Sequence, residues 1–477
     1  MQVDVKNDTV SYFASQAWVN GVWASDVLLS VGKDGLWCGV EANVPASLGQ
    51  NASRLPGPVL PGLVNAHSHA FQRAIAGLTE CRSVDALPTA DDDFWSWRER
   101  MYSAATRITP EQLETIATFL YAELLMGGYT QVCEFHYLHN GPDGKAYADP
   151  LEMSRALVRA AQTVGIGLTL LPTLYMRAGF AAPGLSDDQR RFASTPHGVL
   201  RMVEGMTVEG SLVNAGIAVH SLRAADIAAI VELTQAAQRQ NLAVHIHIAE
   251  QTQEVTDCLA HHGQRPIAYL LDHVDVNPRW NLVHATHTTL EELGRIQQSG
   301  ASIVICPSTE ANLGDGVFDY AGFANLNGNW SIGSDSHVSR SWVEELRLLE
   351  YSQRLTLRKR NIAARAANED SSAAALFNAA LGGGKAATSL PLGGIVVGNR
   401  ADFLVLDDSA PALLGVPQAR LLDALVFSSP SPGFSQVYVA GRQVVSTDGR
   451  TGLQTVTQDW PTLAENFRRT MNELWRC

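Results

Sequence analysis

Two histidines separated by one residue, His67 and His69, are the strongest local signal for chemistry in the sequence. Residues i and i+2 of an extended segment project to the same side, so both imidazoles can reach one metal ion. Zinc suits imidazole and carboxylate ligands, and a catalytic zinc keeps one position open for water. Such a pair is by itself a weak indication of a metal site. Further ligands must therefore come from elsewhere in the chain.

Two residues far along the chain can complete the site. His247 closes the apolar run 243–247, and Asp335 follows the run 330–332. Three histidines and one aspartate, each at the end of a predicted strand, fit a mononuclear metal site. The alternative is that His247 and Asp335 are ordinary buried polar groups with satisfied hydrogen bonds, although buried charges without a function are uncommon.

Two more polar residues could handle protons beside such a metal. Glu250 lies three residues after His247, and His284 ends another apolar run. A metal lowers the pKa of bound water to about 7, so one group must accept a proton and another must protonate the leaving group. We assign the base to Asp335, the acid to Glu250, and orientation of water or charge stabilisation to His284. Glu250 could instead be a carboxylate favoured in a helix first turn.

The elements that would position these residues are eight short apolar runs that alternate with helical patterns. This alternation predicts a parallel sheet, and eight units predict a closed (β/α)8 TIM-like barrel of the α/β class. Chemistry in this fold occurs at the C-terminal ends of the strands, where the candidate residues fall. The runs are 62–66, 130–135, 168–174, 217–219, 243–248, 281–283, 302–305 and 330–332.

The chain has 477 residues, which is too long for one compact core. Strand patterns at both ends predict a small β-sandwich domain made from residues 1–59 and 386–455, around a barrel domain at 60–385. An amphipathic C-terminal helix is expected within 456–477. The stretch 177–197 follows the third strand and contains Gly, Pro and Ser, so we interpret it as a loop over the barrel mouth, where lids commonly lie.

Composition excludes several function classes. The net charge is −13, and no Lys/Arg-rich run offsets it, so nucleic acid is not an expected partner. No apolar stretch approaches the roughly 20 residues that span a bilayer, and the N-terminus lacks a signal pattern. We therefore expect a cytoplasmic protein with no membrane partner. Scattered cysteines without a C-x-x-C pair fit a reducing compartment: Cys38, Cys81, Cys133, Cys258, Cys306 and Cys477.

The motifs together resemble the amidohydrolase superfamily in its deaminase-like branch. The resemblance is carried by residues 61–69, 247–250, His284 and 333–335, and residues 393–406 resemble the closing β-domain of that superfamily. It covers essentially the whole chain. Finer details are similar to the formimidoylglutamate deiminase family, whose members convert N-formimino-L-glutamate to N-formyl-L-glutamate and ammonia in histidine degradation. The matching segments are 69–73, 134–137, 189–192, 220–223 and 334–337.

The resemblance implies a site and a substrate. It implies a homodimer and one zinc ion per site, although the same ligands could hold another divalent ion. It implies metal binding by His67, His69, His247 and Asp335, and proton handling by Glu250 and His284. It implies substrate contacts from Gln72, Arg98, Tyr137, His220 and Arg223.

The implied substrate is a small dianionic amidine, and arginine binds carboxylates bidentately. Arg223 fits that role, but it could also be a helix-start residue paired with Asp226. Two rival functions remain open. One is a deaminase or chlorohydrolase acting on a purine, pterin or triazine ring, whose pocket would be built for stacking. The other is a catalytically dead relative used as a binding module, which loss of a metal ligand or of the acid–base pair would mark.

Overall fold

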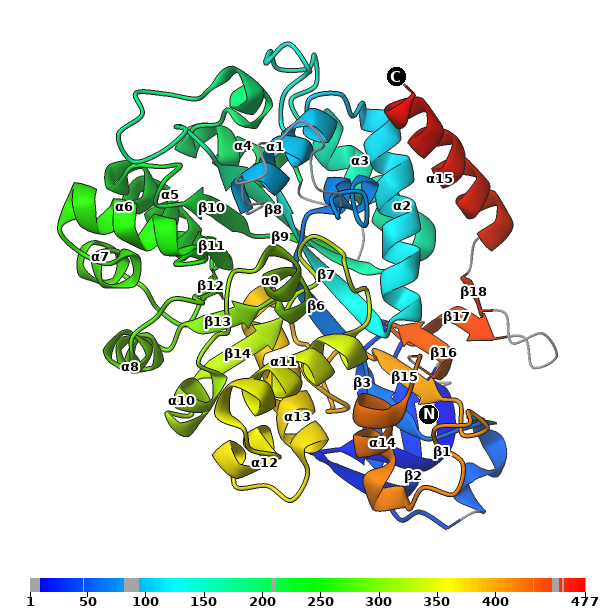
Figure 1. The fold of residues 1–477 in the computed structure, drawn as a ribbon. Coiled ribbons are helices and arrows are strands. Elements are labelled where there is room, and N and C mark those ends of the chain that lie inside the picture. Colours follow the sequence, from blue (N-terminus) through cyan, green and yellow to red (C-terminus); the bar gives the residue numbers. More distant parts are fainter. Residues whose placement is uncertain are drawn as a thin grey trace, which may run out of the picture.

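The computed structural model describes residues 9–45, 47–80, 94–206, 212–431, 433–447, 454–456 and 459–476. Eight parallel strands form a nearly closed barrel in the order β14-β13-β12-β11-β10-β8-β7-β6, with the short β9 beside β8 (Figure 1). Each of the eight predicted runs overlaps one barrel strand, which confirms the predicted fold. The strands are β6 (Leu63–Ser68), β7 (Tyr129–His136), β8 (Gly167–Leu174), β9 (Val213–Ala215), β10 (Ile217–Ser221), β11 (Val244–Ile248), β12 (Trp280–His284), β13 (Ser302–Ile305) and β14 (Asn329–Ile332).

The barrel closes where β6 meets the segment after β14. Ser68 and Asp335 form an isolated parallel bridge, and the Asp335 backbone N–H donates to the His67 oxygen over 3.0 Å. Gly333 permits this close approach, because an added Cβ would lie 2.6 Å from the Cβ of His67. This contact joins the first barrel strand to the segment after the last one. It therefore places the candidate ligands His67 and His69 next to the candidate ligand Asp335.

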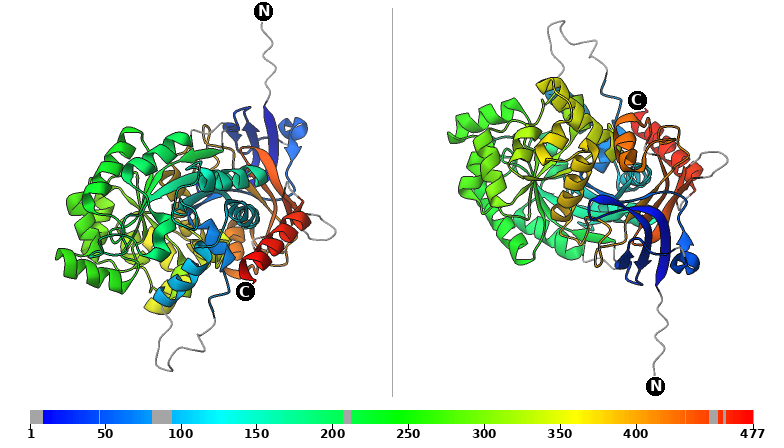
Figure 2. Two further views of the ribbon diagram at one scale, coloured as in Figure 1. Left: turned by 90° about the horizontal axis from the view of Figure 1, so that it is seen from above. Right: turned by 90° about the horizontal axis from the view of Figure 1, so that it is seen from below.

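Helices surround the barrel strands, as the views from above and from below show (Figure 2). Capping explains several of their starts: Thr109 and Gln112 form a capping box before α2, and Thr289 and Glu292 form one before α8. The helices are α1 (Phe94–Ala105), α2 (Pro110–Met126), α3 (Glu152–Val164), α4 (Pro196–Gly205), α5 (Ile227–Arg239), α6 (Thr252–His262), α7 (Pro266–His273), α8 (Leu290–Ser299), α9 (Pro307–Leu313), α10 (Tyr320–Asn325), α11 (Trp342–Leu357), α12 (Ile362–Ala367), α13 (Ser372–Thr388), α14 (Leu421–Ser428) and α15 (Trp460–Trp475).

Strands from both chain ends form a second sheet with a core of its own, which includes Tyr12, Trp37 and Phe403. The two chain ends meet where β15 pairs antiparallel with β5. The precise domain limits given above stay predictions. The strands are β1 (Val10–Val19), β2 (Val22–Val31), β3 (Trp37–Glu41), β4 (Ser53–Arg54), β5 (Val59–Pro61), β15 (Phe403–Leu406), β16 (Phe434–Val439), β17 (Arg442–Thr447) and β18 (Gln454–Val456).

A buried ion pair ties this second sheet to the barrel. The Arg400 guanidinium lies 2.6 Å from Asp402 Oδ2 and also donates to Gln131 Oε1 on β7 over 2.9 Å. Asp402 Oδ1 in turn accepts from the backbone N–H of Ala440. Because each charge has a partner, the cost of burying the pair is offset by directed hydrogen bonds.

The stretch 177–197 is anchored by a buried arginine. Arg191 lies in the 3-10 helix Asp187–Phe192 and donates to the carbonyl oxygens of Asn140, Ala105 and Ile108. The next residue, Phe192, lines the pocket at the barrel mouth, as expected for a loop in this place. Motion of this loop as a lid stays a prediction.

Two of the compositional expectations can be compared with the described residues. Cys38, Cys133, Cys258 and Cys306 are free thiols, whereas Cys81 and Cys477 lie outside the described residues. No helix in the described part of the chain is both long enough and apolar enough to cross a membrane.

Candidate metal centre and active-site pocket

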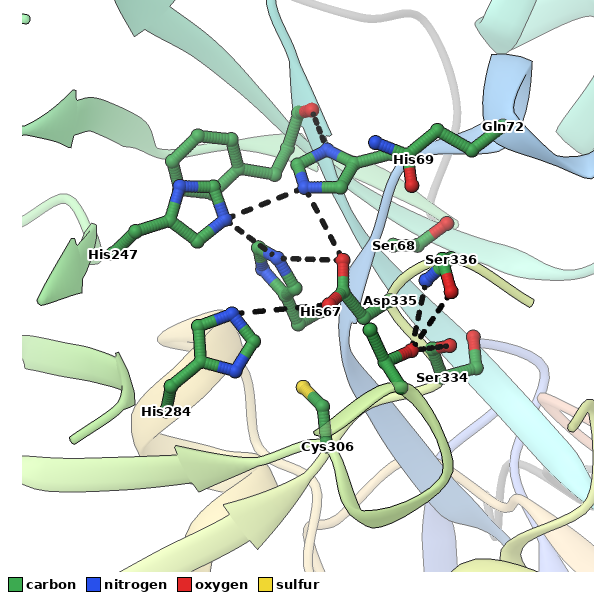
Figure 3. Close-up of polar contacts among 12 residues, drawn as sticks. His67, Ser68, His69, Gln72, His247, His284, Cys306, Ser334, Asp335 and Ser336 are labelled. Atoms are coloured by element: carbon green, nitrogen blue, oxygen red, sulfur yellow. Dashed lines mark hydrogen bonds and ion pairs between the residues drawn. The ribbon is translucent and has the colours of Figure 1, made fainter. Parts of the chain in front are cut away.

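Four predicted ligands converge at the C-terminal end of the barrel (Figure 3). The Nε2 atom of His247 lies 2.9 Å from Nε2 of His67 and 3.3 Å from Nε2 of His69. Asp335 Oδ1 lies 3.4 Å from Nε2 of His67 and 3.4 Å from Nε2 of His69. All four side chains are buried. The structure therefore brings together one oxygen and three nitrogen atoms that start from three separate strands.

The hydrogen bonds behind the rings fix which nitrogen faces the centre. His69 Nδ1 lies 2.8 Å from the Phe135 carbonyl oxygen, and His247 Nδ1 lies 2.9 Å from the His220 carbonyl oxygen. A carbonyl can only accept, so each Nδ1 carries a hydrogen. Burial lowers the pKa of both histidines, which keeps the rings neutral. Their Nε2 lone pairs therefore point at each other and require a cation between them.

The spacing of the four atoms fits a metal ion. Ligand bonds of about 2.0–2.1 Å in a tetrahedral zinc site place neighbouring ligand atoms about 3.3 Å apart. The measured separations between 2.9 and 3.4 Å agree with that value. The backbone carbonyls behind His69 and His247 are the outer partners that orient ligand imidazoles in such sites. Imidazole nitrogens and a carboxylate oxygen are donors that suit zinc.

His284 lies beside this cluster among three carboxylates. Its Nε2 is 3.7 Å from Asp335 Oδ2 and 3.8 Å from Glu250 Oε1, and its Nδ1 is 3.3 Å from Glu310 Oε1. Burial by itself lowers the pKa of His284, but the carboxylates outweigh burial and raise the pKa to about 10. His284 is therefore positioned as a cation. Its backbone φ of +69° is strained for histidine, and strain of this kind concentrates at functional sites.

Glu250 lines the same pocket as Arg223, and its carboxyl can hold a proton. Burial raises the pKa of Glu250 to about 7, against the opposing charges of His284 and Arg223. The backbone N–H of Glu250 donates to Glu254 Oε2, in the first turn of α6. A carboxyl with this pKa exchanges a proton near neutral pH, which general acid–base catalysis requires.

A pocket adjoins the four candidate ligands and is lined by all five residues predicted to contact the substrate. These are Gln72, Arg98, Tyr137, His220 and Arg223. Aromatic side chains form much of the remaining wall: Phe94, Trp97, Tyr102, Tyr175 and Phe192. A concave apolar wall with a few polar groups is typical of a small-molecule site.

Two arginines in this pocket have unsatisfied donors. The Nε groups of Arg98 and Arg223 are buried and have no hydrogen-bond partner in the described structure. Both guanidinium groups lie over the ring of Trp95, at 4.3 and 5.8 Å from its centroid. Asp226, the alternative partner considered for Arg223, instead caps α5 by accepting from the Ala229 N–H. Buried cationic donors without partners are costly, which indicates that an anionic ligand completes them.

A buried carboxylate supports the His67–His69 segment from behind. Glu134 Oε2 accepts from Ser68 Oγ over 2.6 Å and from Tyr121 Oη over 3.2 Å, and Glu134 Oε1 accepts from the Ala70 N–H over 2.6 Å. In the sequence, Glu134 is marked only as the first residue of the matching segment 134–137. The structure gives it three donors and places it directly behind the candidate ligands.

Sequence reasoning missed other residues of the site. Tyr175 packs on His220 with ring centroids 4.2 Å apart, and Gln189 Nε2 donates to the hydroxyls of both Tyr175 and Tyr102. Tyr175 could have been found, because it follows the third predicted strand directly. Tyr102 lies on α1, and Glu310, behind His284, lies on α9. Nothing in the local sequence marks these last two.

Comparisons with known proteins identify the family of this chain. The Amidohydrolase family model matches residues 59–444. A formimidoylglutamate deiminase of Pseudomonas aeruginosa is 46% identical over 440 residues, which cover 92% of this chain and 95% of the relative. An 8-oxoguanine deaminase of the same species is 28% identical, over 62% of this chain and 64% of the relative.

Two solved structures share the fold over nearly the whole chain. An amidohydrolase from Brucella melitensis has a TM-score of 0.88 and 40% identity, covering 98% of this chain and all of that one. An atrazine chlorohydrolase from Arthrobacter aurescens, solved with zinc, has a TM-score of 0.81 at 18% identity, covering 97% and 100%. The second likeness concerns the fold alone. With the family model, these matches show that the chain belongs to the amidohydrolase family.

Proposed function

We propose that this protein hydrolyses N-formimino-L-glutamate to N-formyl-L-glutamate and ammonia. The observation that carries the proposal is a pair of buried Nε–H donors without a hydrogen-bond partner among the described residues, those of Arg98 and Arg223, in the pocket beside the three-histidine, one-aspartate cluster. The ligand has two carboxylates and one cationic formimino group, so it supplies an anion for each arginine. The 46% identity to a formimidoylglutamate deiminase supports the same substrate.

The cluster of His67, His69, His247 and Asp335 would hold one zinc ion, or another divalent ion that accepts the same ligands. When bound, such an ion supplies a water acidified to a pKa of about 7. The rest of the chemistry falls to side chains. Asp335 Oδ2 faces His284 and accepts the proton of the attacking water.

The leaving nitrogen needs a proton donor of its own. Water adds to the formimino carbon, the bond to the terminal nitrogen breaks, and that nitrogen leaves as ammonia. Glu250, whose pKa is raised to about 7, donates the proton that the departing nitrogen needs. Cationic His284 lies between Glu250 and Asp335 and stabilises the negative charge that develops at the reaction centre.

Three neutral residues orient the substrate. Gln72 Nε2 donates to Tyr137 Oη over 3.1 Å, which leaves the tyrosine O–H free to donate into the pocket. His220 packs between Tyr137 and Tyr175, with ring centroids 5.6 and 4.2 Å away. These contacts hold the donors in one geometry before the ligand enters, which lowers the entropic cost of binding.

The decisive experiment compares four substrates in one ammonia-release assay. N-formimino-L-glutamate is tested beside N-formimino-L-aspartate, adenosine and guanine, and the metal content of the same sample is measured. We expect N-formimino-L-glutamate to have the highest kcat/KM. Turnover of a purine without turnover of a formimino acid would reject the proposed substrate and support the ring-deaminase alternative.

Replacing Arg223 by methionine is expected to lower kcat/KM for N-formimino-L-glutamate by about a hundredfold, mainly through KM, because a desolvated charge pair is lost. Steady-state ammonia release measures the effect. Arg239→Met is the matched control, because this arginine is exposed in the last turn of α5. Equal KM values for the Arg223 variant and the wild type would contradict a carboxylate-binding role.

The wider setting is also part of the proposal. We expect one metal ion per chain, a homodimer, a cytoplasmic location and a role in histidine degradation. Metal analysis against protein concentration and sedimentation equilibrium test the first two. A monomer at micromolar concentration with full activity would reject the dimer without affecting the proposed reaction.

A further inference from the structure

The C-terminal helix reaches the active-site segment from outside the barrel. Helix α15 packs beside α2 (Figure 1). Near its end, the indole N–H of Trp475 donates to the Ala74 carbonyl oxygen over 3.1 Å, a contact between residues 401 positions apart. Ala74 is the last residue of the 3-10 helix η2 (Ala70–Ala74), which begins directly after the candidate ligand His69.

Both ends of η2 are held by distant side chains. At its start, the Ala70 N–H donates to Glu134 Oε1 over 2.6 Å. At its end, Ala74 is fully buried, and a carbonyl at the end of a helix has no partner within the helix. The Trp475 indole supplies that partner. Without it, a buried acceptor would be left unsatisfied, which is a strong reason for the segment to shift.

Gln72 lies between these two attachments. Its backbone N–H donates to the His69 carbonyl oxygen over 2.8 Å, and its side chain reaches the hydroxyl of Tyr137 in the pocket. Only 3% of Gln72 is exposed. A shift of η2 would therefore move the Gln72 amide relative to the ligand pocket while leaving the catalytic carboxylates on other elements in place.

Packing around η2 holds α15 in register. Phe467 stacks on Phe119 of α2 with ring centroids 4.3 Å apart and an angle of 12° between the planes. Arg73, within η2, lies over both rings. Arg107 donates to the Leu474 carbonyl oxygen and lies over the ring of Trp475. Helix α15 therefore contacts α2 or η2 at both of its ends and in between.

We propose that Trp475 is a positioning residue: it holds the end of η2 and thereby orients Gln72 toward the substrate. The part that concerns substrate affinity rests on the proposed function, whereas the attachment of η2 does not. The contact acts across the outside of the barrel, so a residue in the last turn of the last described helix sets the geometry of a pocket residue.

The test replaces each tryptophan of α15 by phenylalanine. Trp475→Phe keeps a ring for Arg107 but removes the N–H that Ala74 needs. Trp460→Phe is the matched control, because Trp460 stacks on Phe119 at the other end of the helix and keeps an aromatic ring after substitution. Hydrogen–deuterium exchange of the peptide covering residues 69–78 is measured for both, together with steady-state kinetics.

We expect faster exchange across 69–78 in Trp475→Phe alone, and a KM increased roughly five- to tenfold with kcat changed by less than about twofold. In a Gln72→Ala background, Trp475→Phe should add no further increase in KM, since both changes act through the same amide. Unchanged exchange would overturn the proposal, and so would an additive KM effect in the double variant.

The two proposals fail in distinguishable ways. If the wild type releases no ammonia from N-formimino-L-glutamate, the proposed function is rejected, and the exchange difference still decides whether Trp475 holds η2. If the wild type is active and exchange rises while KM stays at the wild-type value, the attachment exists but Gln72 is not positioned by it, which overturns the inference.

Discussion

Replacing His247 by alanine is expected to remove the bound metal and to lower kcat/KM by at least about a thousandfold, because activation of water and stabilisation of charge are lost together. The Nε2 atom of His247 faces Nε2 of both His67 and His69, at 2.9 and 3.3 Å. The substitution therefore removes the ligand atom that contacts both of the other imidazoles. Metal analysis of the purified variant and ammonia release measure the two effects.

His245 provides a matched control for this loss. It lies two residues earlier on the same strand, is fully buried, and donates from Nε2 to the Ala387 carbonyl oxygen rather than facing the cluster. His245→Ala should lower the melting temperature through a lost hydrogen bond and a cavity, yet keep its metal. A His247→Ala variant with full metal content and wild-type activity would reject the candidate metal centre.

Replacing Glu250 by glutamine is expected to lower kcat by about 10²- to 10⁴-fold while the metal content stays unchanged, because the amide cannot deliver a proton. KM should change little, since the substitution keeps the shape of the side chain. Glu292→Gln serves as the control: this buried glutamate pairs with Arg265 and caps α8, away from the pocket. Wild-type kcat in Glu250→Gln would remove Glu250 from the mechanism.

The carboxyl of Glu250 also predicts how kcat/KM depends on pH. Burial raises the pKa of Glu250 to about 7, so the protonated acid dominates below that pH and is lost above it. The kcat/KM of the wild type should therefore fall as the pH rises through about 7, since kcat/KM reports the free enzyme. The small remaining activity of Glu250→Gln should not show this decline. If kcat/KM of Glu250→Gln still declines through about pH 7, another titrating group causes the decline and this prediction is wrong.

Much of the fold and of the metal centre could be predicted from residue order. The ligand positions follow from two local rules, the two-residue period of a strand and the placement of chemistry at the strand ends of a parallel barrel. His67 and His69 follow the first rule, Asp335 follows the second, and the structure brings their ligand atoms together. Both rules depend on a few neighbouring residues, so they can be applied to the sequence without knowledge of the packing.

Arg223 marks the limit of this local reasoning. Its position after the fourth strand was evident, but pairing with Asp226 was an equally good interpretation. Only the folded chain shows that Asp226 caps α5 and that the Arg223 Nε is buried without a partner. The choice depends on which groups are desolvated, and burial is a property of the complete packing.

The sequence by itself determined the barrel, the order of its strands and the residues that face one another across its mouth. Tertiary structure alone decided which groups support these residues. Glu310 contacts the His284 ring, Gln189 donates to two tyrosine hydroxyls, and Trp475 donates to the last carbonyl of η2. The physical reason is that ligand positions come from short-range backbone periodicity. Supporting contacts join residues up to 401 positions apart, and they depend on which helix faces meet in the folded chain, which the pattern of a single helix does not specify.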